Sequence, residues 1–247
     1  MKHRGMGFDS GLAAGGADSG RQRQSPAAWA ALRRTTPASV TYGISLTTDR
    51  ALLPWRRVGG AWVERLRQWG AGLPDSRVVV FNRARWGVTT SWGKRHVRRR
   101  VCRMKPDLVL VEFAINDADI RRGISPAQSR TNLLAIIDTI RRQYDGCRVV
   151  LMTTNPCLGR HAAYRPELGR YYAVYRELAA ALDLALADME PVWQQLAAED
   201  TDRFRSYLID GKHPTPAACE SLIAPVVIGT VAVALALGQV QAASKSA

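Results

Sequence analysis

The sequence predicts an α/β domain in three layers (α/β/α), with helices on both faces of a parallel sheet of about five strands. Short runs rich in β-branched residues alternate along the chain with longer segments in which apolar residues recur at helical spacing. The short runs are apolar throughout, which is typical of parallel strands covered on both faces. This alternation indicates successive strand, helix and strand units joined by crossovers.

Five runs are predicted as strands, at residues 39–44, 77–81, 107–113, 148–154 and 183–189. The segments between them that carry helical periodicity are residues 60–72, 91–104, 125–144 and 166–183.

The apolar run at residues 222–238 contains no charged residue. It is at the short limit for a membrane span, and Pro225 and Gly229 interrupt it. We interpret it as a buried helix that closes the domain, because a sheet of this class needs such a cover. No membrane span is therefore expected.

The 247 residues, of which 47% are hydrophobic, suit one domain with a tail. Residues 1–25 are rich in Gly, Ser, Asp and Arg and are predicted to be a flexible tail. The domain is expected at 26–240, with a flexible end at 241–247. The first residues lack the continuous apolar segment of a secretory signal, so a cytoplasmic location is expected for this chain as it stands. Export from a longer precursor remains open.

The formal net charge of +14 is compatible with a nucleic-acid or membrane-surface partner and also with an arginine-rich soluble protein. The densest basic stretch, residues 94–105, contains no aromatic residue for base stacking, and we interpret it as the solvated face of a helix. No nucleic-acid partner is expected. The four cysteines have neither C-x-x-C nor zinc spacing, so no metal is expected, and isolated thiols and disulfides both remain open.

Polar residues suited to acyl transfer follow the predicted strands. Ser45 follows the first strand, Gly87 the second and Asn116 the third, and Asp210 and His213 come after the last. In a parallel sheet these positions share the carboxyl edge, where functional residues gather.

Together these side chains match the parts of a serine hydrolase site. Ser45 would be the nucleophile and His213 the base that Asp210 orients, while the Asn116 amide and the Gly87 N–H would bind the oxyanion. Each residue also has a structural interpretation, since Ser45 can cap a segment, Asn116 can cap a loop and Gly87 can shape a turn.

Four segments, GISLTT, NRARWGVTT, FAIND and DGKHP, resemble in order and spacing the conserved blocks of the SGNH (GDSL-type) hydrolase superfamily, over about residues 38–230. The resemblance implies a flavodoxin-like sheet, no metal and no organic cofactor. It makes Ser45 the nucleophile, with its own backbone N–H joining Gly87 and Asn116 in the oxyanion hole. It makes His213 the base and Asp210 its support.

Three positions depart from the family pattern. Ile44 stands where the family usually has Asp, Ala84 where it has Gly, and Ala114 where it often has Gly. None of these positions has a direct chemical role, so the departures bear on loop geometry and not on the class of reaction.

The superfamily covers carbohydrate O-acetyl esterases, lipases, lysophospholipases and thioesterases. For this chain we expect a serine esterase that removes small acyl groups, acetyl above all, from a carbohydrate or similar alcohol. An O-acyltransferase and a non-catalytic glycan-binding protein of the same fold are the alternatives, and the oligomeric state is open.

The expected substrate contacts are His161 and Arg165, from the long segment after the fourth strand, and Trp86. Trp92 and Tyr164 are further aromatic candidates for stacking on a sugar ring, with a place in the core as the alternative.

Overall fold

The structure is a computed structural model and describes residues 38–43, 47, 61–73 and 78–245. The predicted tail at 1–25 and the positions of Ile44 and Ser45 lie outside the described residues.

The sheet has five parallel strands in the order β2-β1-β3-β4-β5. The strands are β1 (Ala38–Gly43), β2 (Val79–Asn82), β3 (Leu108–Glu112), β4 (Arg148–Met152) and β5 (Ala185–Ala187). This is the flavodoxin-like order, and the strands fall within one or two residues of most of the predicted bounds. The expected α/β fold is confirmed.

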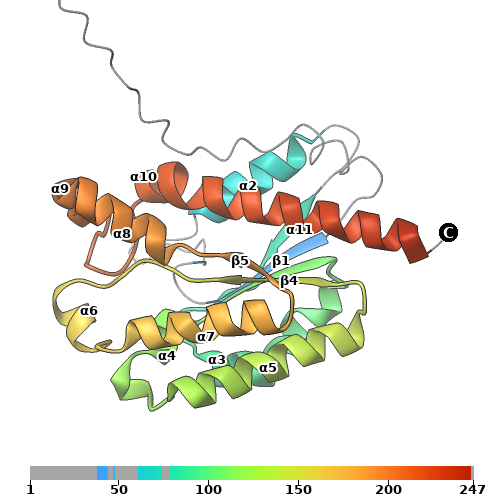
Figure 1. The fold of residues 1–247 in the computed structure, drawn as a ribbon, viewed down its shortest axis with the longest axis horizontal. Coiled ribbons are helices and arrows are strands. Elements are labelled where there is room, and N and C mark those ends of the chain that lie inside the picture. Colours follow the sequence, from blue (N-terminus) through green and yellow to red (C-terminus); the bar gives the residue numbers. More distant parts are fainter. Residues whose placement is uncertain (1–37, 44–46, 48–60, 74–77, 246–247) are drawn as a thin grey trace, which may run out of the picture.

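Helices cover both faces of the sheet, which gives the three layers seen in Figure 1. One layer contains α3 (Thr90–Arg100), α5 (Pro126–Gln143) and α7 (Leu168–Ala181). The other contains α2 (Ala61–Ala71), α8 (Glu190–Glu199), α9 (Thr201–Ser206) and α11 (Ala224–Lys245). The shorter elements are α4 (Ala114–Asp117), α6 (Gly159–Ala163), α10 (Pro216–Ala218), the 3-10 helices η1 (Cys102–Met104) and η2 (Ile120–Arg122), and the π-helical η3 (Cys219–Ile223).

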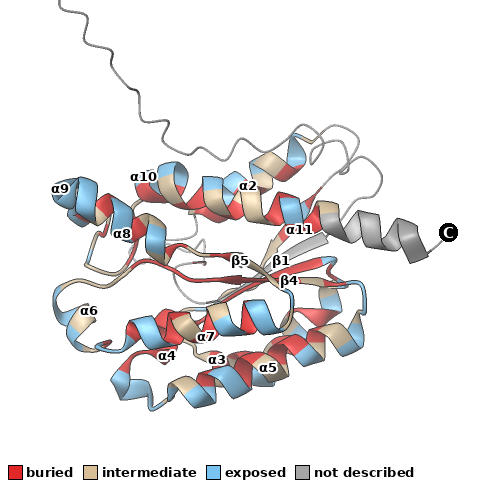
Figure 2. Ribbon diagram, viewed as in Figure 1, coloured by how far each residue is buried: buried red, intermediate tan, exposed pale blue. Residues whose placement is uncertain are grey.

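The central strand β3 is buried along its whole length, and its side chains alternate between two hydrophobic cores. Val109 and Val111 pack with α3, α5 and α7, whereas Leu108 and Leu110 pack on the opposite face with α2, α8 and α11. Figure 2 shows the same arrangement, with buried residues concentrated on the helix faces that meet the sheet. This double burial explains why the strand has no polar face in the sequence.

Helix α3 carries the basic stretch in the way the sequence predicted. Val97 is buried against the sheet, while Lys94, Arg95 and Arg98 are exposed to solvent. The run of arginines at the end of the helix also places positive charge near the negative end of its dipole.

Helix α11 covers the sheet next to α2, β4 and β5. By length and composition alone, Pro216–Ala236 would be long enough to cross a membrane, but half of its most apolar window is buried inside the protein. Val227, Val231 and Leu235 all belong to the core on this face. The helix thus closes the domain, and it continues to Lys245, beyond residue 240, where we expected the domain to end.

Helices α8 and α9 were not predicted from the sequence. They follow β5 and contribute Trp193, Leu196 and Phe204 to the core on the same face of the sheet as α11. Asp200 caps α9 by accepting a hydrogen bond from the Arg203 backbone N–H. The four cysteines, left open above, are free thiols.

The close approach of α3 to the sheet yields a stability prediction. A Cβ added at Gly93 would lie 2.9 Å from Cζ of Phe113 and 3.0 Å from Cδ1 of Ile136, both of them in the core. We expect Gly93→Ala to lower the free energy of unfolding by about 1–3 kcal/mol in urea titrations, because overpacking outweighs the better helix propensity of Ala. Gly146→Ala is the control, since an added Cβ there meets nothing within 4 Å. Equal stability of the two variants would contradict this account of the packing.

Candidate active site

The end of β1 is tied to its two neighbouring strands through Thr47, two positions after Ser45 in the sequence. The Asn82 side chain donates to the Thr47 carbonyl at 2.7 Å, and the Thr47 hydroxyl donates to the Glu112 carboxylate at 3.1 Å. Glu112 is fully buried at the end of β3. Thr47 is thus held at the carboxyl edge of the sheet.

The structure brings two expected oxyanion donors, Gly87 and Asn116, into one hydrogen-bonded unit. The Asn116 amide donates to the carbonyl of Val88, the residue after Gly87, at 3.0 Å. This bond orients the amide group, whose second N–H remains as a donor for a ligand. Gly87 has φ of +63°, in the left-handed region that favours glycine.

Asp117, next to Asn116 in the short helix α4, anchors this unit to two helices. Its carboxylate accepts hydrogen bonds from the Thr90 backbone N–H at 2.8 Å, from the Thr90 hydroxyl at 2.6 Å and from the Ser129 hydroxyl at 2.7 Å. Burial raises the pKa of Asp117, although these hydrogen bonds act in the opposite direction. Asp117 therefore has a structural role, which is to hold α4 against α3 and α5.

Asp210 and His213 form the pair expected of a base and its orienting carboxylate. Nδ1 of His213 lies 2.8 Å from Oδ2 of Asp210. The other oxygen of Asp210 accepts hydrogen bonds from the backbone N–H groups of His213 and Lys212. Burial by itself would raise the pKa of Asp210, but the hydrogen bonds from His213 outweigh it and hold this pKa well below its usual range. An ionised Asp210 fixes the tautomer of His213 in which Nδ1 carries the proton.

The loop that carries this pair is fastened to the segment after β4. The Asn155 side chain donates to the Lys212 carbonyl at 2.7 Å, and the Leu158 backbone N–H donates to the Gly211 carbonyl at 2.7 Å. Gly211 has φ of +81°, and a Cβ there would lie 3.0 Å from the Leu158 carbonyl oxygen. Glycine is required at this position on both counts.

Trp86 connects His213 to the segment that carries Gly87. Its ring is stacked beside the His213 imidazole, with the ring centroids 6.4 Å apart, and it directly precedes Gly87. The structure therefore gathers Trp86, Gly87, Asn116, Asp210 and His213 at one edge of the sheet.

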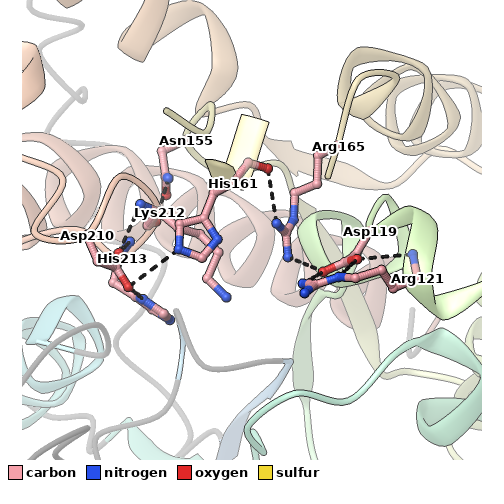
Figure 3. A network of polar contacts seen from close by, with 8 residues as sticks. All are labelled: Asp119, Arg121, Asn155, His161, Arg165, Asp210, Lys212 and His213. Atoms are coloured by element: carbon pink, nitrogen blue, oxygen red, sulfur yellow. Dashed lines mark hydrogen bonds and ion pairs between the residues drawn. The ribbon is translucent and has the colours of Figure 1, made fainter. Parts of the chain in front are cut away.

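Arg165 lies behind the site, almost fully buried. Its guanidinium donates to the carbonyl of His161 and to the carboxylate of Asp119 (Figure 3). It also donates to the carbonyl of Ile115. Ile115 immediately precedes Asn116 in α4, so these bonds steady the segment that carries Asn116. This placement favours a supporting role for Arg165 over the contact with substrate that we expected.

His161, on α6, lies between the Asp210–His213 pair and the Arg165–Asp119 pair in Figure 3. Its Nε2 is 4.0 Å from Oδ2 of Asp210. Burial lowers the pKa of His161, against the opposing effect of Asp210, so its ring is neutral at neutral pH.

The other aromatic candidates have protein partners. Trp92 stacks on His96 at 4.5 Å between centroids and has the guanidinium of Arg100 over its ring. The guanidinium of Arg121 lies 3.8 Å from the ring centroid of Tyr164. Both rings thus have a face covered within the protein.

Two of the departures from the family pattern are accommodated locally. Ala84 donates its backbone N–H to the Asn82 side chain at 3.1 Å, and Ala114 is buried at the start of α4. Neither alanine has a positive φ, so neither position requires glycine. Ile44 lies outside the described residues.

Sequence reasoning missed the supporting residues Glu112, Asp119 and Asn155. A charged residue within an apolar strand run is a usable signal for Glu112, whereas the partners of the other two are distant in sequence. Among the described residues, no group of three or more His, Cys, Asp and Glu side chains is arranged to hold a metal ion.

Residues 38–220 match the model of the GDSL-like lipase/acylhydrolase family. No curated protein matches the chain.

Several solved structures share the fold. A lipase/acylhydrolase from Enterococcus faecalis is similar with a TM-score of 0.68 and 24% identity, over 80% of this chain and 96% of that one. An acetylxylan esterase from Geobacillus stearothermophilus has a TM-score of 0.66 and 17% identity, over 81% of this chain and 96% of that one. A two-domain esterase active on acetylated mannans has a TM-score of 0.63 and 16% identity, over 83% of this chain and 51% of that one.

The family match covers most of the chain and includes each segment that forms the site. The chain therefore belongs to the GDSL-like lipase/acylhydrolase family and is an ester hydrolase.

Proposed function

We propose that the protein is a serine esterase that removes small acyl groups, acetyl above all, from a carbohydrate or similar alcohol. The observation that carries the reaction type is the 2.8 Å bond between Asp210 and His213, at the same sheet edge that holds Gly87 and Asn116. The acetyl and carbohydrate parts are supported by the likeness of the fold to an acetylxylan esterase and to an esterase active on acetylated mannans.

In the first half of the reaction, Ser45 Oγ attacks the carbonyl carbon of the ester while Nε2 of His213 takes the hydroxyl proton. The tetrahedral oxyanion accepts hydrogen bonds from the Asn116 amide and from the backbone N–H groups of Gly87 and Ser45. The bond from carbon to the alcohol oxygen then breaks, His213 returns its proton to that oxygen, and the acyl group stays on Ser45.

In the second half, His213 takes a proton from water, whose oxygen attacks the acyl-enzyme carbonyl. Collapse of this intermediate breaks the bond to Ser45 Oγ, which recovers its proton from His213, and the carboxylic acid leaves. Asp210 remains ionised throughout and stabilises the imidazolium in both halves.

The nucleophile assignment predicts selective chemical labelling. A fluorophosphonate probe should label Ser45 and no other serine, and Ser45→Ala should abolish both labelling and hydrolysis of p-nitrophenyl acetate. The circular dichroism and thermal midpoint of the variant should match wild type, because the change removes only a hydroxyl. Labelling at a different serine would refute the assignment.

The oxyanion assignment predicts a selective loss of kcat in Asn116→Ala. Removal of one donor should lower kcat by about 10²–10³ with KM nearly unchanged, because the bond matters most in the transition state. Asn116→Asp should be at least as damaging, since it places negative charge beside the oxyanion. Asn132→Ala is the matched control, because Asn132 is an equally buried amide that bonds Thr90 and Ser91 instead. Equal kcat in the Asn116 variants and wild type would make Asn116 a structural residue only.

The anchoring of the segment around Asn116 predicts different effects on stability for two arginines that both bind Asp119. Arg165→Met removes a buried partner and should lower the free energy of unfolding by about 3–5 kcal/mol. Arg121→Met should have a small effect, because the Arg121 side chain is 56% exposed. Denaturant titrations of the two variants and wild type compare these changes directly.

The pH dependence of the same titrations provides a further check. Hydrogen bonds from Arg121, together with the positive charge of Arg165, hold the pKa of Asp119 at about 2, below its unfolded value. The stability that Asp119 contributes is therefore present above about pH 4 and is lost as pH falls through about 2. The deficit of Arg165→Met should shrink over this interval. A deficit that is the same at pH 2 and pH 6 would show that the ion pair contributes nothing.

A further inference from the structure

The ring of His161, which lies beside the Asp210–His213 pair, forms no hydrogen bond with any residue that the structure describes. Both ring nitrogens are sheltered from solvent, and neither forms a hydrogen bond within the described part of the chain. Oδ2 of Asp210 lies 4.0 Å from Nε2, which is beyond hydrogen-bond distance. More than nine in ten buried polar groups in native proteins are hydrogen-bonded, so this ring is a marked exception.

A second donor without a hydrogen bond among the described residues lies beside His213. The indole Nε1 of Trp86 is buried and has no hydrogen-bond partner among the described residues. Its ring is stacked beside His213, to which Asp210 is hydrogen-bonded. Two segments distant in sequence thus direct unpaired polar side chains to the surroundings of His213.

The position of Trp86 and His161 indicates which part of an ester they would contact. His213 returns its proton to the leaving alcohol, so the alcohol part of the substrate lies next to His213. The acyl oxygen lies instead at Gly87 and Asn116. Side chains that flank the Asp210–His213 pair therefore face the alcohol.

The chemistry of the ring indicates which group it recognises. A neutral imidazole offers one N–H donor and one nitrogen acceptor. A hydroxyl group is likewise a donor and an acceptor, and it pairs with such a ring without any change of charge. The lowered pKa of His161 is consistent with this neutral form.

We propose that His161, together with Trp86, recognises a hydroxyl group on the alcohol part of the ester, so that the substrate alcohol is a polyol such as a sugar. This inference rests on the proposed esterase function and deepens it by assigning the residues that select the alcohol. A site built to hydrogen-bond a substrate hydroxyl discriminates strongly against the analogue that lacks it, because its own polar groups are then left unpaired.

Two acetate esters that differ only in hydroxyl groups test the proposal, namely 2,3-dihydroxypropyl acetate and propyl acetate. The readout is the ratio of their kcat/KM values, which cancels changes that affect both substrates alike. We expect wild type to favour the dihydroxy ester by about tenfold or more. His161→Phe should bring this ratio close to one, and His161→Gln, which keeps a donor and an acceptor, should retain more of the ratio than Phe does.

The control is His96→Phe, the same substitution on α3, where Nδ1 already contacts the Trp92 carbonyl oxygen at 2.8 Å. It should leave the ratio at the wild-type value. If His161→Phe proves unfolded by circular dichroism, His161→Leu takes its place and the same fall in the ratio is expected.

Three outcomes overturn the inference. A wild-type ratio near one would show that the site does not discriminate between alcohols with and without hydroxyl groups, although the acetyl esterase proposal would stand. An unchanged ratio in the apolar His161 variant, with both kcat/KM values at the wild-type level, would show that His161 makes no such contact. Equal losses on both esters would show that His161 acts on Asp210 instead. Failure of wild type to hydrolyse either ester would count against the proposed function itself.

Discussion

Three buried carboxylates at the carboxyl end of β3 hold the catalytic edge of the sheet together. Glu112 accepts a hydrogen bond from Thr47, Asp117 binds Thr90 and Ser129, and Asp119 binds Arg165 and Arg121. Each carboxylate reaches a different part of the chain, and a buried charge is tolerated only when it is paired or hydrogen-bonded. The need to satisfy these three groups fixes the loops around Asn116, which lies among them.

The Asp210–His213 pair is positioned by a separate set of bonds. Asn155 and Leu158 hold the backbone of Lys212 and Gly211, and the Asp210 carboxylate holds both the backbone and the ring of His213. Gly87 and Asn116 therefore follow β2 and β3, whereas the Asp210–His213 pair lies on the loop after α9, and Trp86 and His161 lie beside that pair. Precise relative placement of such groups is what allows a serine hydrolase to stabilise its transition state.

The sequence predicts the sheet and its reactive edge well because both depend on local patterns. The β-branched runs gave the five strands, and polar residues after them gave Asn116, Asp210 and His213 at one edge. Helices α8 and α9 were missed, since each is short and buries few residues, so its periodicity is weak. Partners that are remote in sequence also leave no local trace, as with Arg165, whose bonds to Ile115 and Asp119 span 50 and 46 residues.

The contrast between Arg165 and His161 shows how the structure separates support from recognition. Both were candidates for binding substrate, and they lie four residues apart. Arg165 bonds two carbonyls and a carboxylate of its own chain, which commits it to the fold. The His161 carbonyl accepts a hydrogen bond from Arg165. Neither ring nitrogen of His161 forms a hydrogen bond within the described residues. Native proteins pair nearly all of their buried polar groups, and exceptions to such rules are expected at functional sites. The ring of His161, which lacks a hydrogen bond among the described residues, is therefore a better candidate than Arg165 for binding a substrate.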